Sequence, residues 1–174
     1  SLIAAALAVA VGLFLVYGVR LSSGRALQRA VRFAGIGYAV PGAVLAVGIM
    51  IPLAALDNTV DGLARQTFGV STGLILSGTL FAIVYGYLVR FLALSLGTVE
   101  AGLAKITGGM DGAARTLGLG PFQTMVKIHL PMMRGSILTA AILVFVDCMK
   151  ELPITILLRP FNFDTLATYV HQFA

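Results

Sequence analysis

Four long stretches with few or no charged side chains dominate this sequence. Residues 2–19, 34–56 and 71–89 contain no Asp, Glu, Lys or Arg, and residues 136–158 contain such side chains only in their second half. A helix rises about 1.5 Å per residue, so roughly 20 mostly apolar residues cross the hydrocarbon core of a bilayer. The sequence therefore predicts four membrane-spanning helices, at about residues 2–19, 34–56, 71–92 and 136–158.

The composition excludes the other broad classes of protein. Of the 174 residues, 59% are hydrophobic and 11% are charged, whereas soluble domains carry about 25% charged residues. A chain this apolar buries its surface instead of remaining disordered, and its unbroken apolar runs lack the alternating polarity of membrane β-strands. The single cysteine, Cys148, has no partner for an internal disulfide. We therefore expect one all-α, polytopic transmembrane domain over residues 1–174.

The basic residues predict how the chain is oriented in the membrane. The connections after the first and third spans each contain four Lys or Arg residues, and the connection after the second span contains one. Cytoplasmic loops are enriched in Lys and Arg, so the first and third connections are expected in the cytoplasm. Arg90, at the end of the third uncharged run, fits this orientation. Because these basic residues flank spans and have no interleaved aromatic residues, they favour contact with membrane lipid over a nucleic-acid partner.

The third connection, at about residues 95–134, carries signals for short helices. Thr98 and Pro121 suit helix starts, and two pairs of nearby glycines suit helix ends. The pattern predicts helices at residues 99–106, 110–117 and 122–129, the last ending before Pro131. A short helix between glycine breaks at the membrane surface can insert into a groove on another protein.

The middle of this connection resembles a motif of a known transporter family. Residues 111–114 read Asp-Gly-Ala-Ala, Gly118 follows four residues later, and residues 128–131 read Ile-His-Leu-Pro. The residue types and their spacing are similar to the EAA loop in the permeases of binding-protein-dependent ABC transporters. The family's acidic position falls on Gly112, and Asp111 stands immediately before it.

The resemblance implies that this loop couples the chain to an ABC ATP-binding subunit. The residues that the motif assigns to this contact are Asp111, Gly112, Ala113, Ala114 and Gly118. Small side chains allow close approach to a partner, and an acidic side chain near a helix start suits the helix dipole. The sequence contains no GxxxxGK[ST] motif. We therefore expect this chain to bind no cofactor and to be no enzyme, with ATP and Mg held by the partner subunit.

Two further stretches resemble the iron(III) branch of this family. They are residues 32–49, in which residues 37–42 read Gly-Tyr-Ala-Val-Pro-Gly, and residues 149–167, which begin Met-Lys-Glu-Leu-Pro. The resemblance implies the permease core of a type I ABC importer in the bacterial cell inner membrane, with ferric iron delivered by a periplasmic solute-binding protein. It also implies a second permease half or copy, and further spanning helices that make this sequence a fragment with its terminal helices missing.

Three charged residues in the fourth span need an explanation, because a charge in the bilayer core is costly. On a helix, Asp147 lies within reach of both Lys150 and Glu151, which leaves one carboxylate in excess. In one interpretation these residues and Pro153 line the translocation path or a gate, where oxygen ligands suit a hard cation such as ferric iron. In the other, the cluster lies at the external surface, Pro153 ends the helix and residues 154–158 pack back on neighbours, because a helix of residues 131–151 is already roughly 31 Å long.

The sequence leaves the metal ligands and the cargo open. His129 is expected to be a loop residue, and His171 has no His, Cys or acidic residue at ligand spacing. Within the same class, the cargo could instead be thiamine, a polyamine or an oxyanion. A different class, an ion-coupled secondary transporter or channel, would use the charged cluster to relay charge and the cytoplasmic loop only as a linker.

Overall fold

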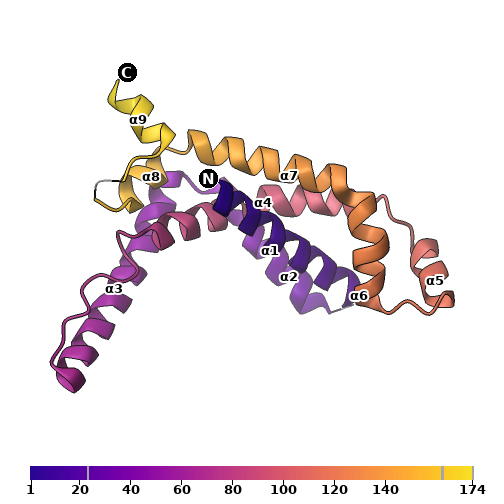
Figure 1. Cartoon of the computed structure of the whole chain (residues 1–174), viewed down its shortest axis with the longest axis horizontal. Helices are drawn as coiled ribbons and strands as arrows, with labels where there is room; N and C mark the ends of the chain where they lie inside the picture. The colour runs from indigo at the N-terminus through magenta and orange to yellow at the C-terminus, as the bar shows by residue number, and fades with distance from the viewer. Residues whose placement is uncertain (23, 162, 174) are drawn as a thin grey trace.

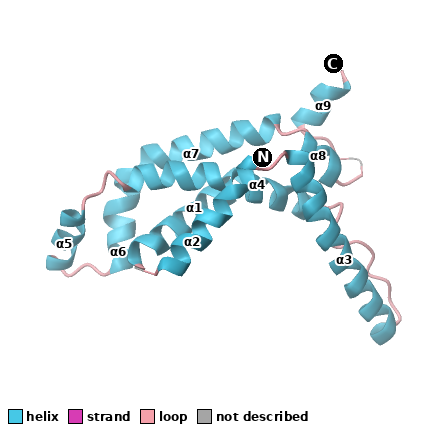
Figure 2. Ribbon diagram, turned by 180° about the vertical axis from the view of Figure 1, so that it is seen from behind, coloured by secondary structure: helices cyan, strands magenta, loops and turns pink. Residues whose placement is uncertain are grey.

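The structure, a computed structural model, describes residues 1–22, 24–161 and 163–173. Within these residues it contains helices and no strands (Figures 1 and 2). The long helices are α1 (Leu2–Leu21), α3 (Gly42–Phe68), α4 (Leu80–Leu103) and α7 (Leu130–Lys150). In the described part of the chain, four helical stretches are long and apolar enough to cross a membrane: α1, α3, α4 and the stretch that ends with α7. The predicted all-α membrane fold is confirmed.

Short helices connect and follow the long ones. They are α2 (Arg25–Ala34), a 3-10 turn (Gly35–Ala39), α5 (Gly108–Thr116), α6 (Pro121–Thr124), a π-helical turn (Met125–His129), α8 (Pro153–Leu158) and α9 (Leu166–Gln172). Figure 1 shows α5 at one end of the molecule, whereas α8 and α9 lie toward the other.

Helices α1, α4 and α7 pack side by side, and α4 contacts both of the others (Figures 1 and 2). A Cβ atom at Gly12 of α1 would overlap the Ser95 side chain of α4. A Cβ atom at Gly102 of α4 would lie 2.6 Å from the Ser136 Cβ atom of α7. Lipid tails are as apolar as leucine, so close packing stabilises helix pairs in a membrane. The two glycines therefore set how closely α4 approaches its neighbours.

The outer part of α3 extends away from this bundle, and the loop of residues 69–79 runs back along it (Figures 1 and 2). Two carboxylates hold this loop. The buried Asp57 side chain accepts hydrogen bonds from the backbone N–H groups of residues 75–77 at 2.7–3.1 Å. Asp61 accepts from those of residues 72 and 73. The two carboxylates thus accept the hydrogen bonds that backbone N–H groups would otherwise donate within a helix or a sheet.

The second and third helices lie further along the chain than predicted. The stretch predicted as span 34–56 forms the 3-10 turn and then α3, which begins after Pro41 and reaches Phe68. The stretch predicted as span 71–92 begins with the loop, and α4 starts only at Leu80. The backbone N–H groups that bond to Asp57 and Asp61 are unavailable to a helix, and hydropathy alone contains no sign of these bonds.

The fourth long helix ends at Lys150, earlier than the predicted residue 158. The backbone of Glu151 is extended, and Pro153 has no N–H group to continue the helix. The chain turns into α8, whose Ile154 and Leu158 side chains are buried. These two side chains pack against Gly86 of α4, where a Cβ atom would lie 2.9 Å from Leu158. The structure thus contains a helix end shortly before Pro153, which starts α8, and the packing of Ile154 and Leu158 on α4.

The connection between α4 and α7 differs from the prediction on both sides of its middle helix. Residues 99–103 belong to α4, which passes through Thr98 without a break, so the separate helix predicted at 99–106 is wrong. The helix predicted at 110–117 is present as α5. Helix α6, the π-helical turn and α7 follow one another directly, and the chain bends sharply before α7 (Figure 1). Proline and π-helical turns are usual causes of such bends, so Pro131 bends the helix and does not end it.

Candidate functional site

Helix α5 stands apart from the bundle, beyond the ends of α1 and α4 (Figures 1 and 2). The structure describes all nine of its residues, and among them only Ala114 is buried. The basic residues of the adjoining connections predict that this end of the molecule lies in the cytoplasm. A mostly exposed helix at this position is the candidate site for contact with another subunit.

The five motif residues lie on two sides of this segment. Ala114 is 1% exposed and Asp111 is half-buried, so both face the bundle. Gly112, Ala113 and Gly118 are exposed. Gly118 follows the end of α5 with a φ angle of +75°, a left-handed conformation that favours glycine.

The Asp111 carboxylate makes its contacts within the chain. Its Oδ2 atom accepts a hydrogen bond from Nη2 of Arg20 at 2.7 Å, and its Oδ1 atom lies 2.9 Å from Nε2 of His129. Burial raises the pKa of this carboxyl group, but the bond and the charge of Arg20 outweigh burial and hold the pKa of Asp111 below its ordinary value of 3.8. At neutral pH the ionised carboxylate therefore faces α1, and its contact with an ATP-binding subunit stays a prediction.

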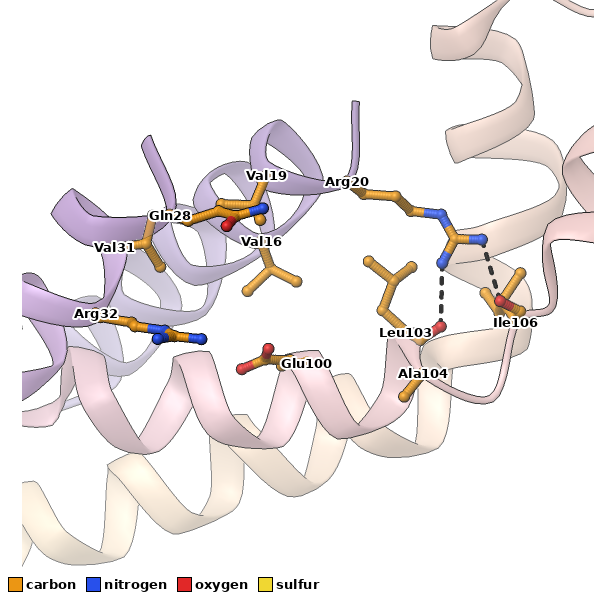
Figure 3. Close-up of a pocket in the computed structure, with 10 residues that line it drawn as sticks. All are labelled: Val16, Val19, Arg20, Gln28, Val31, Arg32, Glu100, Leu103, Ala104 and Ile106. Carbon is orange, nitrogen blue, oxygen red and sulfur yellow. Dashed lines mark hydrogen bonds between the residues drawn. The ribbon is translucent and has the colours of Figure 1, made fainter. Parts of the chain in front are cut away.

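Arg20 also bonds to the end of α4. Its Nη1 and Nη2 atoms donate to the carbonyl oxygens of Leu103 at 3.2 Å and Ile106 at 3.1 Å (Figure 3). The last carbonyl groups of a helix have no partner within it, so Arg20 supplies donors where α4 ends. Beside Arg20 lies a cavity of about 440 Å³ between α1, α2 and α4, into which Arg32 and Glu100 also point.

His129 is buried, contrary to the expectation that it is a loop residue. It belongs to the π-helical turn, is 2% exposed, and its ring packs on Tyr17 of α1 with 5.7 Å between ring centroids. The Tyr17 hydroxyl donates to the carbonyl oxygen of Pro121 at 2.9 Å. The sequence did not assign Tyr17, Arg20 or His129 to the site. Tyr17 and Arg20 are distant from the motif along the chain, and His129 stands between two motif residues without being one itself.

The segment of α5 and α6 carries exposed apolar side chains. Leu117 is 78% exposed and Phe122 is 71% exposed, and Met110 and Ala113 are also exposed. Met110, Ala113 and Leu117 recur at helical spacing and therefore share one face. We call these four residues the docking face, because several exposed apolar side chains on one short segment are typical of contact with another protein. The periodicity of the first three is visible in the sequence and could have been used to find them.

Glu151 pairs with Arg90, which lies on a different helix. Nε of Arg90 is 3.0 Å from Oε2 of Glu151, and Nη1 of Arg90 donates to the carbonyl oxygen of Val40 at 2.6 Å. Arg90 lies in the interior of α4, which continues to Leu103, so it does not mark the end of this helix. The pair joins α4 to the end of α7 inside the bundle. In the described residues Asp147 forms no ion pair with Lys150, although both belong to α7, and Glu151 lies beyond the end of this helix.

Of the other predicted path residues, Pro153 lies beside this pair, because a Cβ atom at Gly42 would overlap Oε1 of Glu151 and lie 3.4 Å from Cβ of Pro153. Asp147 is half-buried and Lys150 is exposed on α7, and Pro153 is exposed at the start of α8. Among the described residues there is no group of three or more His, Cys, Asp or Glu side chains that could hold a metal ion. Of the four predicted path or gate residues, the structure brings only Glu151 into an ion pair.

Four apolar helical stretches define a multi-pass membrane protein, and an exposed short helix lies between two of them. Residues 4–163 match a family described as "Binding-protein-dependent transport system inner membrane component". The chain belongs to this family, and it is therefore an inner-membrane component of a transport system.

The curated relatives of this chain are named for the transport of two different substances. The chain is 28% identical over 120 residues to the Fe(3+)-transport system permease protein FbpB 2 of Haemophilus influenzae, covering 69% of this chain and 24% of that protein. It is 28% identical over 91 residues to the putative 2-aminoethylphosphonate transport system permease protein PhnV of Salmonella typhimurium and of Salmonella paratyphi A, covering 52% of this chain and 34% of each relative. The chain thus spans between a quarter and a third of the length of these relatives.

Proposed function

We propose that this chain forms part of the permease of an ATP-driven importer and that α5 is its coupling helix. The observation that carries the proposal is the exposure of α5 and its docking face in a chain of this family. The motif at residues 111–118 supports it, since Gly112 and Gly118 are exposed on the same segment and Ala113 is itself part of the docking face. The partners in this proposal are ATP-binding subunits, a periplasmic solute-binding protein and a second permease half or copy.

The mechanism follows from how α5 is joined to the bundle. ATP and Mg bind to the partner subunits, and their closure displaces the docked α5. The chain connects α5 directly to α4 on one side and to α6 and α7 on the other, so the displacement reaches the bundle. Alternating arrangements of these helices open the path first to one side of the membrane and then to the other.

The path in this proposal runs along the side of α7 that carries Asp147 and Lys150. Lys150 is exposed and Asp147 is half-buried at the edge of the packed side of α7. The buried residues that define this packed side are Met133, Ala140, Val144 and Cys148. Charged side chains are costly against lipid, which supports a position of Asp147 and Lys150 facing water and the second permease half. Glu151 acts differently, because its pair with Arg90 holds the end of α7 against α4.

We propose ferric iron as the cargo, supported by the FbpB 2 relative and by the resemblance of residues 32–49 and 149–167 to the iron(III) branch. The PhnV relatives support a second candidate cargo, 2-aminoethylphosphonate. The two cargoes differ in charge and in size. An experiment can therefore distinguish them by the ligand that the periplasmic binding protein carries.

The test uses the full transporter, with its ATP-binding subunits, in proteoliposomes. ATP hydrolysis and uptake are measured with the binding protein loaded with ferric iron, loaded with 2-aminoethylphosphonate, or empty. We expect stimulation by the iron-loaded protein. Stimulation only by the binding protein loaded with 2-aminoethylphosphonate would show that this compound, and not ferric iron, is the cargo. The assignment as an ATP-driven importer would stand. Uptake that needs an ion gradient and no ATP would overturn the class, in favour of a secondary transporter or channel.

A further inference from the structure

The last two turns of α1 contact every part of the segment that carries α5. Before α5, Arg20 bonds to carbonyl groups at the end of α4, and within α5 it bonds to Asp111. After α5, Tyr17 bonds to Pro121 and packs on the buried His129. The end of α1 is therefore a junction for the whole connection between α4 and α7.

Helix α5 has little other attachment to the bundle. Ala114 is the one buried side chain among its nine described residues. A Cβ atom added at Gly112 would have no neighbour within 4 Å among the described residues, so α5 is open to solvent or a partner at this position. A charge-assisted hydrogen bond of 2.7 Å between Arg20 and Asp111 is strong by comparison. A displaced α5 therefore acts on the bundle chiefly through Asp111 and through its two chain connections.

The shape of Arg20 suits the transmission of movement. Its guanidinium group is planar, and its two terminal nitrogens bond to three acceptors on two different segments. Because the guanidinium group is planar and rigid, little conformational freedom is lost for each hydrogen bond it forms. A lysine ammonium group, by contrast, is a point charge on a flexible side chain. Arg20 therefore connects the end of α4 and α5 to α1 as one unit.

We infer that Arg20 is a positioning residue that carries the displacement of α5 to α1, so that α1 moves with α5 when the ATP-binding subunits close. This inference rests on the proposed function, in which ATP drives α5. In this inference the displacement of α5 reaches α1 as well as the two helices that the chain joins directly to α5. Helix α1 is far from α5 along the chain.

The test follows distances between spin labels in the full transporter with its ATP-binding subunits, in lipid nanodiscs, with and without ATP and vanadate. Labels at Phe14→Cys and Leu138→Cys report on α1 relative to α7, and labels at Thr116→Cys and Leu138→Cys report on α5. All three sites are exposed. Cys148 is 2% exposed and should stay unlabelled.

In the parent transporter we expect trapping with ATP and vanadate to change both distances. In Arg20→Gln and Asp111→Asn the α5 distance should still change, while the population with displaced α1 falls about tenfold. Arg29→Gln is the matched control, because Arg29 is an exposed arginine of α2, and it should behave like the parent. Asp111→Asn keeps the bonds of Arg20 to α4, so it decides the question if Arg20→Gln does not fold.

Other outcomes would overturn the inference. One is an α1 displacement of parental size in Asp111→Asn, and another is a parent in which α5 moves and α1 does not. Failure of the ATP-binding subunits to associate with the parent protein is a separate result, which would contradict the proposed function itself.

Discussion

Arg90 of α4 and Glu151 at the end of α7 form an ion pair, with 3.0 Å between Nε and Oε2. Arg90 also bonds to the backbone of Val40, just before α3 begins. A Cβ atom at Gly42 would overlap the Glu151 carboxylate, so the start of α3 lies directly against the pair. Three spanning helices therefore meet at one pair of opposite charges.

Glu151→Gln should destabilise the transporter by about 3 kcal/mol, because it leaves the Arg90 charge buried without its partner. Thermal unfolding of the purified complex measures this change. Asp147→Asn, which removes a carboxylate without an ion pair among the described residues, is the control and should change the unfolding temperature little. Equal unfolding temperatures for Glu151→Gln and the parent would show that the pair does not hold α7 to α4.

Gly42→Ala should disturb the same pair through packing. The added methyl group overlaps Oε1 of Glu151, and we expect a loss of about 1–3 kcal/mol in the free energy of unfolding. Gly48→Ala is matched to it, since Gly48 lies on the same helix with nothing within 4 Å of its Cβ position. This control should be neutral or slightly stabilising. The prediction fails if the two variants unfold alike.

Phe122→Ala should weaken binding of the ATP-binding subunit about tenfold, because truncation of an aromatic residue that anchors a contact typically costs more than 1 kcal/mol. The affinity is measured between the purified permease in nanodiscs and the isolated ATP-binding subunit. Phe161→Ala removes a fully exposed phenylalanine at the other end of the molecule and should leave the affinity unchanged. A parental affinity in Phe122→Ala and Leu117→Ala together would exclude the docking face.

The attachment of α5 should depend on pH only in acid. The pKa of Asp111 is lower in the folded protein than its ordinary value of 3.8. Its ionised form therefore stabilises the fold fully above pH 3.8, and this contribution disappears as the pH falls through the depressed pKa. The mobility of a spin label at Thr116→Cys should thus be constant from pH 8 to about pH 5 and rise only below about pH 4. Asp111→Asn should show high mobility throughout, and a transition near neutral pH would contradict this assignment.

Asp57→Ala should release the loop of residues 69–79. It removes the acceptor of three backbone N–H groups, and we expect a loss of about 2–3 kcal/mol in local stability. Limited proteolysis from the outer side of the membrane measures the release, which should appear as faster cleavage between α3 and α4. Asn58→Ala, at an exposed neighbouring position, should be cleaved at the parental rate. Slow cleavage of Asp57→Ala would show that other contacts hold the loop.

The number of spans could be predicted from the sequence, whereas their limits could not. Exclusion of charge from a bilayer acts on each segment alone, so uncharged runs identify the helices. The start of α4 depends on bonds from residues 69–79 to Asp57 and Asp61, and the end of α7 depends on Pro153 and the pair of Glu151 with Arg90. These are contacts between segments, which hydropathy does not record.

The candidate site was likewise predictable where its signals are local. Glycines and small residues at 108–118 correctly indicated a short helix, and Gly118 adopts the left-handed turn that a glycine permits. The partner of Asp111 was not predictable, because Arg20 stands 91 residues before it and any of several cytoplasmic arginines could have filled its role.

The bend between α6 and α7 gives a displaced α5, in the proposed mechanism, a lever arm on α7. Helix α6 lies across the direction of α7 (Figures 1 and 2), so a sideways force on α5 and α6 would act on α7 as a torque. The half-buried Asp147 lies one turn after the buried Val144, at the edge of the packed side of α7. A modest turn of α7 would therefore carry Asp147 toward or away from the interior, so that a small movement at the membrane surface would alter the polarity facing the interior.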